Sequence, residues 1–93
     1  MICHVVLVRL REKEKTDWVL DQAQNVLGSV PGVQNLRIGK GIKDDYEYPI
    51  SFVMEFDNEK VLESYQDHAE HVRFRDDVLA PLIDDKKVYD YEV

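Results

Sequence analysis

The sequence predicts an α+β fold in which two helical regions pack on a four-stranded antiparallel sheet. Segments 2–10 and 50–56 have the apolar patterns of strands, whereas 16–30 and 58–79 repeat apolar residues at helical spacing. Pro31-Gly32 and Pro81 are turn and helix-stop signals that separate these segments. The elements alternate along the chain, and this alternation favours a mixed fold over a helical bundle or a β-sandwich.

The first strand is expected over residues 2–10, which are rich in β-branched side chains and almost continuously apolar. Val5, Val6, Leu7 and Val8 point alternately to the two faces of a strand, so both faces would be apolar. We therefore expect this strand to be covered on both sides.

The first helix is expected to begin at Thr16, a common N-cap residue, and to end at Pro31-Gly32. Residues 33–40 then predict a short second strand, and residues 41–48 a solvated loop. Trp18, near the start of the helix, is expected to be a packing residue. The apolar stripe that would face the sheet comprises Val19, Ala23, Val26, Leu27 and Val30.

The second half of the chain predicts a strand, a helix and a final strand. Apolar residues occupy every second position of 50–56, so one face of the third strand is clearly apolar. Asp57 or Asn58 is the expected cap of the second helix, whose apolar residues face inward and which continues, as regular or irregular helix, to Pro81. Residues 88–93 are expected to form the fourth strand, with Tyr89 and Tyr91 on one face as interface or core residues.

The order βαββαβ is the ferredoxin-like arrangement, and residues 1–93 are expected to form a single domain. In this arrangement both helices cover one face of the sheet and leave the other face open. An open apolar face needs a cover, and the simplest cover is the sheet of a second copy. We therefore expect a homodimer.

Composition limits the classes of partner and compartment. With 19 acidic and 12 basic residues the chain has a net charge of −7, which argues against binding nucleic acid or an anionic membrane. The apolar start of the chain is too short to span a bilayer and lacks the features of a signal peptide. Cys3 is the single cysteine, so no internal disulfide can form, and we expect a cytoplasmic protein.

The chain resembles the stress-responsive A/B barrel domain, or Dabb, family. The likeness spans nearly all of it and rests on five features, namely His4, the turn Val30-Pro31-Gly32-Val33, Gly39, the run Tyr65-x-x-His68-x-x-His71, and Val88-Tyr89-Asp90-Tyr91. The resemblance implies a dimeric α/β barrel built from two ferredoxin-like sheets. Family members include stress-induced plant proteins, polyketide cyclases that close a ring by aldol chemistry, and many bacterial proteins without an assigned activity.

The resemblance also implies roles for particular residues. In cyclase-type members the positions of Tyr65 and His71 face the pocket, with the histidine as general base, so His71 and Tyr65 are the expected catalytic residues. His4 and His68 are the expected substrate-binding residues. Two positions depart from the family pattern. Ala69 replaces a frequent proline, which predicts a softer helix break, and Ile50 replaces a strand-three histidine.

Structural packing is the alternative for these side chains. Residues three apart on a helix are neighbours, so Tyr65 and His68 could pack at the boundary of helix and sheet with polar ends bonded to backbone. His68, Glu70 and His71 are also metal-ligand types, but a tight transition-metal site needs three or four converging ligands, so we expect no metal and no cofactor.

Two functional classes remain open from the sequence. The first is an enzyme, cyclase-like or isomerase-like, that binds a small apolar or aromatic carbonyl compound and uses His71 as base and Tyr65 as hydrogen-bond donor. The second is a non-catalytic dimer that binds a small hydrophobic ligand or acts in a stress response. A third class, a cofactor-free monooxygenase or haem-degrading enzyme, rests on fold analogy alone.

Overall fold

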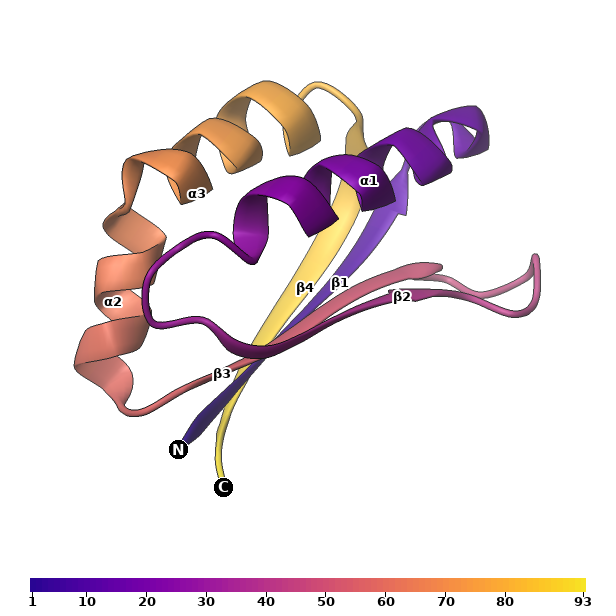
Figure 1. The fold of residues 1–93 in the computed structure, drawn as a ribbon. Helices are drawn as coiled ribbons and strands as arrows, with labels where there is room; N and C mark the ends of the chain where they lie inside the picture. The colour runs from indigo at the N-terminus through magenta and orange to yellow at the C-terminus, as the bar shows by residue number, and fades with distance from the viewer.

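The computed structural model describes residues 1–93 and shows the ferredoxin-like α+β fold (Figure 1). The strands are β1 (Ile2–Leu10), β2 (Gln34–Lys40), β3 (Ile50–Phe56) and β4 (Ile83–Glu92). The helices are α1 (Thr16–Leu27), α2 (Glu59–Asp67) and α3 (Ala69–Arg73). A short 3₁₀-helix, Lys13–Lys15, leads into α1, and a π-helical segment, Phe74–Leu79, continues α3. None of the helices has the length and apolar character needed to cross a membrane.

All the helices lie on one face of a four-stranded sheet with the strand order β2-β3-β1-β4 (Figure 1). Each neighbouring pair is antiparallel, and β1 lies between β3 and β4. The chain termini lie close together at one end of the sheet, where the backbone N–H of Val93 donates to the carbonyl of Met1 at 3.0 Å. The predicted fold class is thus confirmed.

The core lies between the helices and the sheet. The alternation read in residues 50–56 is realised in β3, where Ile50, Phe52, Met54 and Phe56 are all buried against the helices. Burial of such side chains contributes about 1.5–3 kcal/mol each. The helices add the buried residues Val19, Ala23, Leu27, Leu62, Tyr65, Phe74 and Leu79.

The opposite face of the sheet carries no helix (Figure 1), and its central positions are apolar. Val8 is fully buried on the helix side, so Val5 and Leu7, which are an odd number of residues away, lie on the open side. Val5 pairs across the strands with Val53 and Tyr89. Tyr89 is 47% exposed, so this face holds a large aromatic side chain that the rest of the chain leaves half uncovered.

The structure differs from the sequence prediction at several element ends. Thr16 was expected to be an N-cap, but it lies within α1 at φ −56° and ψ −53°, because the 3₁₀-helix runs directly into it and makes Lys15 the cap residue. β4 begins at Ile83 rather than Val88, since Asp85 pairs with Arg9 along β1. Trp18, expected to pack, remains 48% exposed.

Candidate functional site

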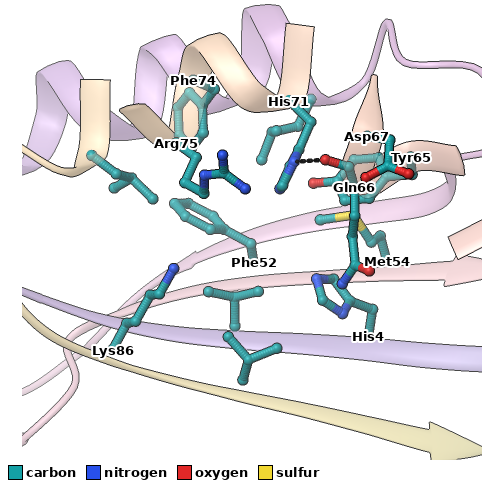
Figure 2. A pocket seen from close by; sticks show the side chains of 14 residues that line it. His4, Phe52, Met54, Tyr65, Gln66, Asp67, His71, Phe74, Arg75 and Lys86 are labelled. Atoms are coloured by element: carbon teal, nitrogen blue, oxygen red, sulfur yellow. Dashed lines mark hydrogen bonds between the residues drawn. The ribbon is translucent and has the colours of Figure 1, made fainter. Parts of the chain in front are cut away.

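A cavity of about 370 Å³ lies between the helix-facing side of the sheet and the α2–α3 region (Figure 2). The strands form its floor, with side chains from β1, β3 and β4, and the helices form its roof. Both apolar and polar groups line it, as is usual for small-molecule sites of this size. The lining residues that matter below are His4, Phe52, Tyr65, His71, Arg75 and Lys86.

The roof is shaped by a break between two helices at His68. Asn58 caps the start of α2 by accepting a hydrogen bond from the Val61 backbone N–H at 3.0 Å. The helix ends at Asp67, and His68 adopts an extended conformation, with φ −67° and ψ 138°. Its Nδ1 then accepts from the Glu70 backbone N–H at 3.1 Å and so caps α3. The chain therefore changes direction at His68.

The break brings Tyr65 and His71 together. Tyr65 lies in the last turn of α2 and His71 in the first turn of α3, and their ring centroids are 4.5 Å apart. His4 reaches the same space from β1, with its ring 6.0 Å from that of Tyr65. Three of the four residues proposed from the sequence thus line one cavity (Figure 2).

His68 is the exception, because it does not line the cavity. Its imidazole caps α3, so its bonded ring nitrogen faces backbone rather than a ligand. The expected adjacency of Tyr65 and His68 on one helical face is wrong, since His68 has left the helical conformation. The structure therefore gives its substrate-binding role no geometric support.

The His71 ring has a defined tautomer. Its Nδ1 lies 2.9 Å from the backbone carbonyl of Gln66 (Figure 2), and because a carbonyl can only accept, Nδ1 must carry the proton. In the neutral ring Nε2 then keeps a free lone pair. Burial lowers the pKa of His71 below its usual value, the Gln66 bond partly opposes this, and the charges of Arg75, His4 and Lys86 lower the pKa further. The ring is therefore a neutral base near pH 7.

The Tyr65 hydroxyl is free to bond a ligand. The residue is only 2% exposed, and no protein group bonds its hydroxyl. In agreement with this, burial is the one cause that raises the pKa of Tyr65. Every fully buried side-chain nitrogen or oxygen in the protein has a hydrogen-bond partner. An unpaired hydroxyl must therefore be reachable by solvent, and the cavity is the space beside it.

His4 is held by a group that sequence reasoning did not single out. Its Nδ1 is hydrogen-bonded to the carboxylate of Asp90, the residue directly opposite it on β4. His4 is 3% exposed, and because no buried nitrogen lacks a partner, its unbonded Nε2 must reach the cavity. The clue was the phase of β4, which places Asp90 on the face opposite Tyr89, but its partner depends on strand register.

These groups together can perform proton transfer. An unprotonated nitrogen of His71 stands beside a phenol that can donate, within a partly closed space, and such a pair can take a proton from carbon and hydrogen-bond the resulting enolate. No group of three or more His, Cys, Asp or Glu side chains is placed to hold a metal ion. The residues missed from the sequence are those whose position depends on tertiary structure, namely Gln66, Asp67, Arg75, Lys86 and Asp90.

The fold and the cavity define a ferredoxin-like α+β protein with a cavity between its helices and its sheet. The family model described as "Stress responsive A/B Barrel Domain" (Dabb) matches residues 2–93, and the chain belongs to this family. The family predicted from the sequence is confirmed. A search of curated proteins finds no match to the sequence.

Solved structures place the chain among related folds. A Dabb-family protein with a ferredoxin-like fold from Mesorhizobium loti is 26% identical, with a TM-score of 0.89 and coverage of 99% of this chain and 95% of that one. A dimeric ferredoxin-like protein of unknown function from Bacteroides fragilis is 23% identical, with a TM-score of 0.83 over 99% and 95%. The hydroxynitrile lyase of Passiflora edulis is 13% identical, with a TM-score of 0.81 over 99% and 92%.

Proposed function

We propose that this protein binds a small apolar or aromatic carbonyl compound in the cavity and catalyses proton transfer at the carbon next to the carbonyl. His71 Nε2 takes the proton and becomes imidazolium, and the electron pair of the C–H bond moves into an enolate. Tyr65 donates a hydrogen bond to the enolate oxygen. Return of the proton to a different atom gives isomerisation, and attack of the enolate on a second carbonyl gives ring closure.

The pairing of Tyr65 and His71 carries this proposal. The His71 ring is anchored through one nitrogen to the Gln66 carbonyl, and its other nitrogen has no hydrogen-bond partner within the protein. A structural tyrosine this deeply buried would bond its hydroxyl, and Tyr65 does not. Two unsatisfied groups on rings 4.5 Å apart in a cavity are what proton transfer needs.

We also propose that the working form is a homodimer. The open face of the sheet supports it, because Val5, Leu7 and Val53 share this face with the half-exposed Tyr89 and Tyr91. An exposed apolar surface of this kind usually marks an interaction site. The Bacteroides fragilis relative is named as dimeric, which supports the same arrangement here.

The alternative is a non-catalytic dimer of the stress response. The Passiflora edulis neighbour is named as a lyase, but at 13% identity the likeness shows the fold alone. The distinction therefore depends on whether His71 exchanges protons. A non-catalytic binder would gain stability from ligands without turning them over.

Deuterium incorporation tests the proposal. Acetophenone and benzoylacetone are incubated with the protein in heavy water, and loss of the proton signal next to the carbonyl is followed by NMR. His71→Asn is the sharp variant, because the asparagine amide can still donate to the Gln66 carbonyl while the base nitrogen is removed. We expect it to lose on the order of 10²-fold or more of the exchange rate, and Tyr65→Phe on the order of 10²-fold.

His68→Asn is the matched control. It removes an imidazole from the same region, but an asparagine still accepts from the Glu70 N–H and keeps the cap. We expect it to retain the wild-type rate. Wild-type exchange no faster than the buffer reaction, or equal losses in His68→Asn and His71→Asn, would refute the catalytic role.

A further inference from the structure

Two cationic side chains stand at one end of the cavity, and the proton-transfer chemistry gives them no role. Arg75 comes from the π-helical segment in the roof, and Lys86 comes from β4 in the floor. In Figure 2 both lie on one side of His71, whereas Asp67, Gln66 and His4 lie on the other. The cavity therefore has a positive end.

Lys86 is unusual in its position. It pairs across the strands with Val8, and Val8 is fully buried against the helices, so Lys86 also lies on the helix-facing side of the sheet. Core residues dominate that side. Lys86 forms no ion pair, although Arg9, Lys40 and Arg73 each have a carboxylate partner. Lys86 is an exposed residue, and its ammonium, which has no carboxylate partner, lines the cavity on the face that also holds His4 and Asp90.

Arg75 can still bind an anion. Its Nε donates to one oxygen of Asp76 at 2.9 Å, and one terminal nitrogen lies 3.5 Å from the other oxygen. The second terminal nitrogen has no partner, and the planar guanidinium can present it to another acceptor. Arg75 and Lys86 thus offer two donors from opposite walls.

The charges of this pair reach the reacting groups. Burial is the main cause of the lowered pKa of His71, but the charges of Arg75 and Lys86 each lower this pKa further, so both cations act on the ring. Between the cations and the Tyr65–His71 pair lie apolar walls, including Phe52 and Phe74, whose rings meet edge to face at 5.9 Å. The cavity therefore matches a ligand with an anionic end, a flat apolar body and a carbonyl.

Net charge makes this local arrangement selective. The whole chain carries −7, which repels anions at long range. Arg75 and Lys86 would therefore attract an acidic ligand only at their end of the cavity, and not over the rest of the surface. An ester of the same shape would lose that attraction and keep the apolar contacts.

We propose that Arg75 and Lys86 bind the carboxylate of an aryl keto acid whose carbonyl lies between Tyr65 and His71. This inference rests on the proposed function, because it assigns a substrate class to the same cavity. The carboxylate is not consumed. It orients the ligand so that the carbon next to the carbonyl faces His71 Nε2.

Matched probes test it. Para-acetylbenzoate and its methyl ester share the ring and the ketone and differ only in charge. Binding is followed by the NMR signal of the His71 ring proton between its two nitrogens, in wild type, Lys86→Met, Arg75→Gln and Lys43→Met. Lys43 lies in the β2–β3 loop and does not line the cavity, so its variant controls for net charge.

We expect wild type and Lys43→Met to bind the acid about tenfold or more tightly than the ester, as a charge-assisted hydrogen bond would give. Lys86→Met and Arg75→Gln should remove most of this preference while binding of the ester is unchanged. Salt should weaken binding of the acid and leave the ester unaffected. Without ligand, Lys86→Met should raise the pKa of His71, because a nearby positive charge is removed.

Equal affinity for acid and ester in wild type, no binding of the acid, or a preference that survives Lys86→Met would overturn the inference. The proposed function fails separately. Preferred binding of the acid without deuterium exchange would refute the catalytic proposal and leave the carboxylate site standing. Equal exchange of both probes would refute the carboxylate site and leave the catalysis standing.

Discussion

Tyr65→Phe should leave the fold almost as stable as wild type. The substitution keeps the ring and its contact with Phe56, whose centroid lies 5.0 Å away, and removes only the hydroxyl. That hydroxyl bonds no protein group, so no hydrogen bond is lost and no buried partner is left unpaired. The free energy of unfolding should therefore stay within about 1 kcal/mol of the wild-type value. Tyr65→Ala, which removes the ring, should cost about 3–5 kcal/mol.

Urea unfolding followed by circular dichroism measures the difference. Protein concentration is held fixed, because the stability of a dimer depends on it, and an unchanged denaturant slope confirms that only stability has changed. Tyr48→Phe is the contrasting control, since the Tyr48 hydroxyl donates to Asp85 and this bond raises the pKa of Tyr48 to about 12. It should lose more stability than Tyr65→Phe. A loss above about 2 kcal/mol for Tyr65→Phe would mean that its hydroxyl has a buried partner, and the cavity argument would be wrong.

Assembly and pH dependence provide two further predictions. Light scattering after gel filtration should give about twice the chain mass of 10.9 kDa for wild type. Leu7→Asp puts a charge on the open face and should give the single-chain mass. A wild-type mass of 10.9 kDa would contradict the dimer. Burial lowers the pKa of His71, so the unfolded chain binds a proton at this ring more readily than the folded chain does. The free energy of unfolding should therefore decrease as pH falls below the ordinary pKa of 6.5. The free energy of unfolding should therefore decrease less between pH 7 and pH 5 for His71→Asn than for wild type. Equal decreases would contradict the lowered pKa of His71. The charged and titratable groups around His71 are Tyr65, Asp67, Arg75, Asp76, His4 and Lys86.

The strands with a strong pattern could be predicted from sequence, whereas the fourth could be predicted only in part. Residues 50–56 alternate because one face is buried, and β3 spans the same residues. The start of β4 was missed because Asp84 and Asp85 have the composition of a loop. In the structure Asp85 pairs with Arg9 of β1, and Asp84 accepts from Arg9 Nε at 2.7 Å, so the acidic segment is a strand because of its pairing with the other end of the chain. No local pattern contains that information.

The candidate site divides in a similar way. Tyr65, His71 and His4 were found because the family resemblance supplied their spacing, and all three line the cavity. Asp90 and Lys86 were missed because their roles depend on the register between β1 and β4, which places them opposite His4 and Val8. A one-residue shift would turn both away from the helices, and sequence patterns fix register only where one face is strongly apolar.

The helix break shows how a departure from the family pattern is compensated. A proline after His68 would force His68 into an extended conformation, and Ala69 imposes no such restriction. Nevertheless His68 is extended, because its Nδ1 accepts from the Glu70 N–H at 3.1 Å and its carbonyl accepts from the Val72 N–H at 3.0 Å. These two bonds start α3 in a new direction and so aim His71 at Tyr65. The direction of the proposed base therefore depends on a histidine outside the cavity, and a variant that keeps the acceptor at position 68 separates this structural role from a chemical one.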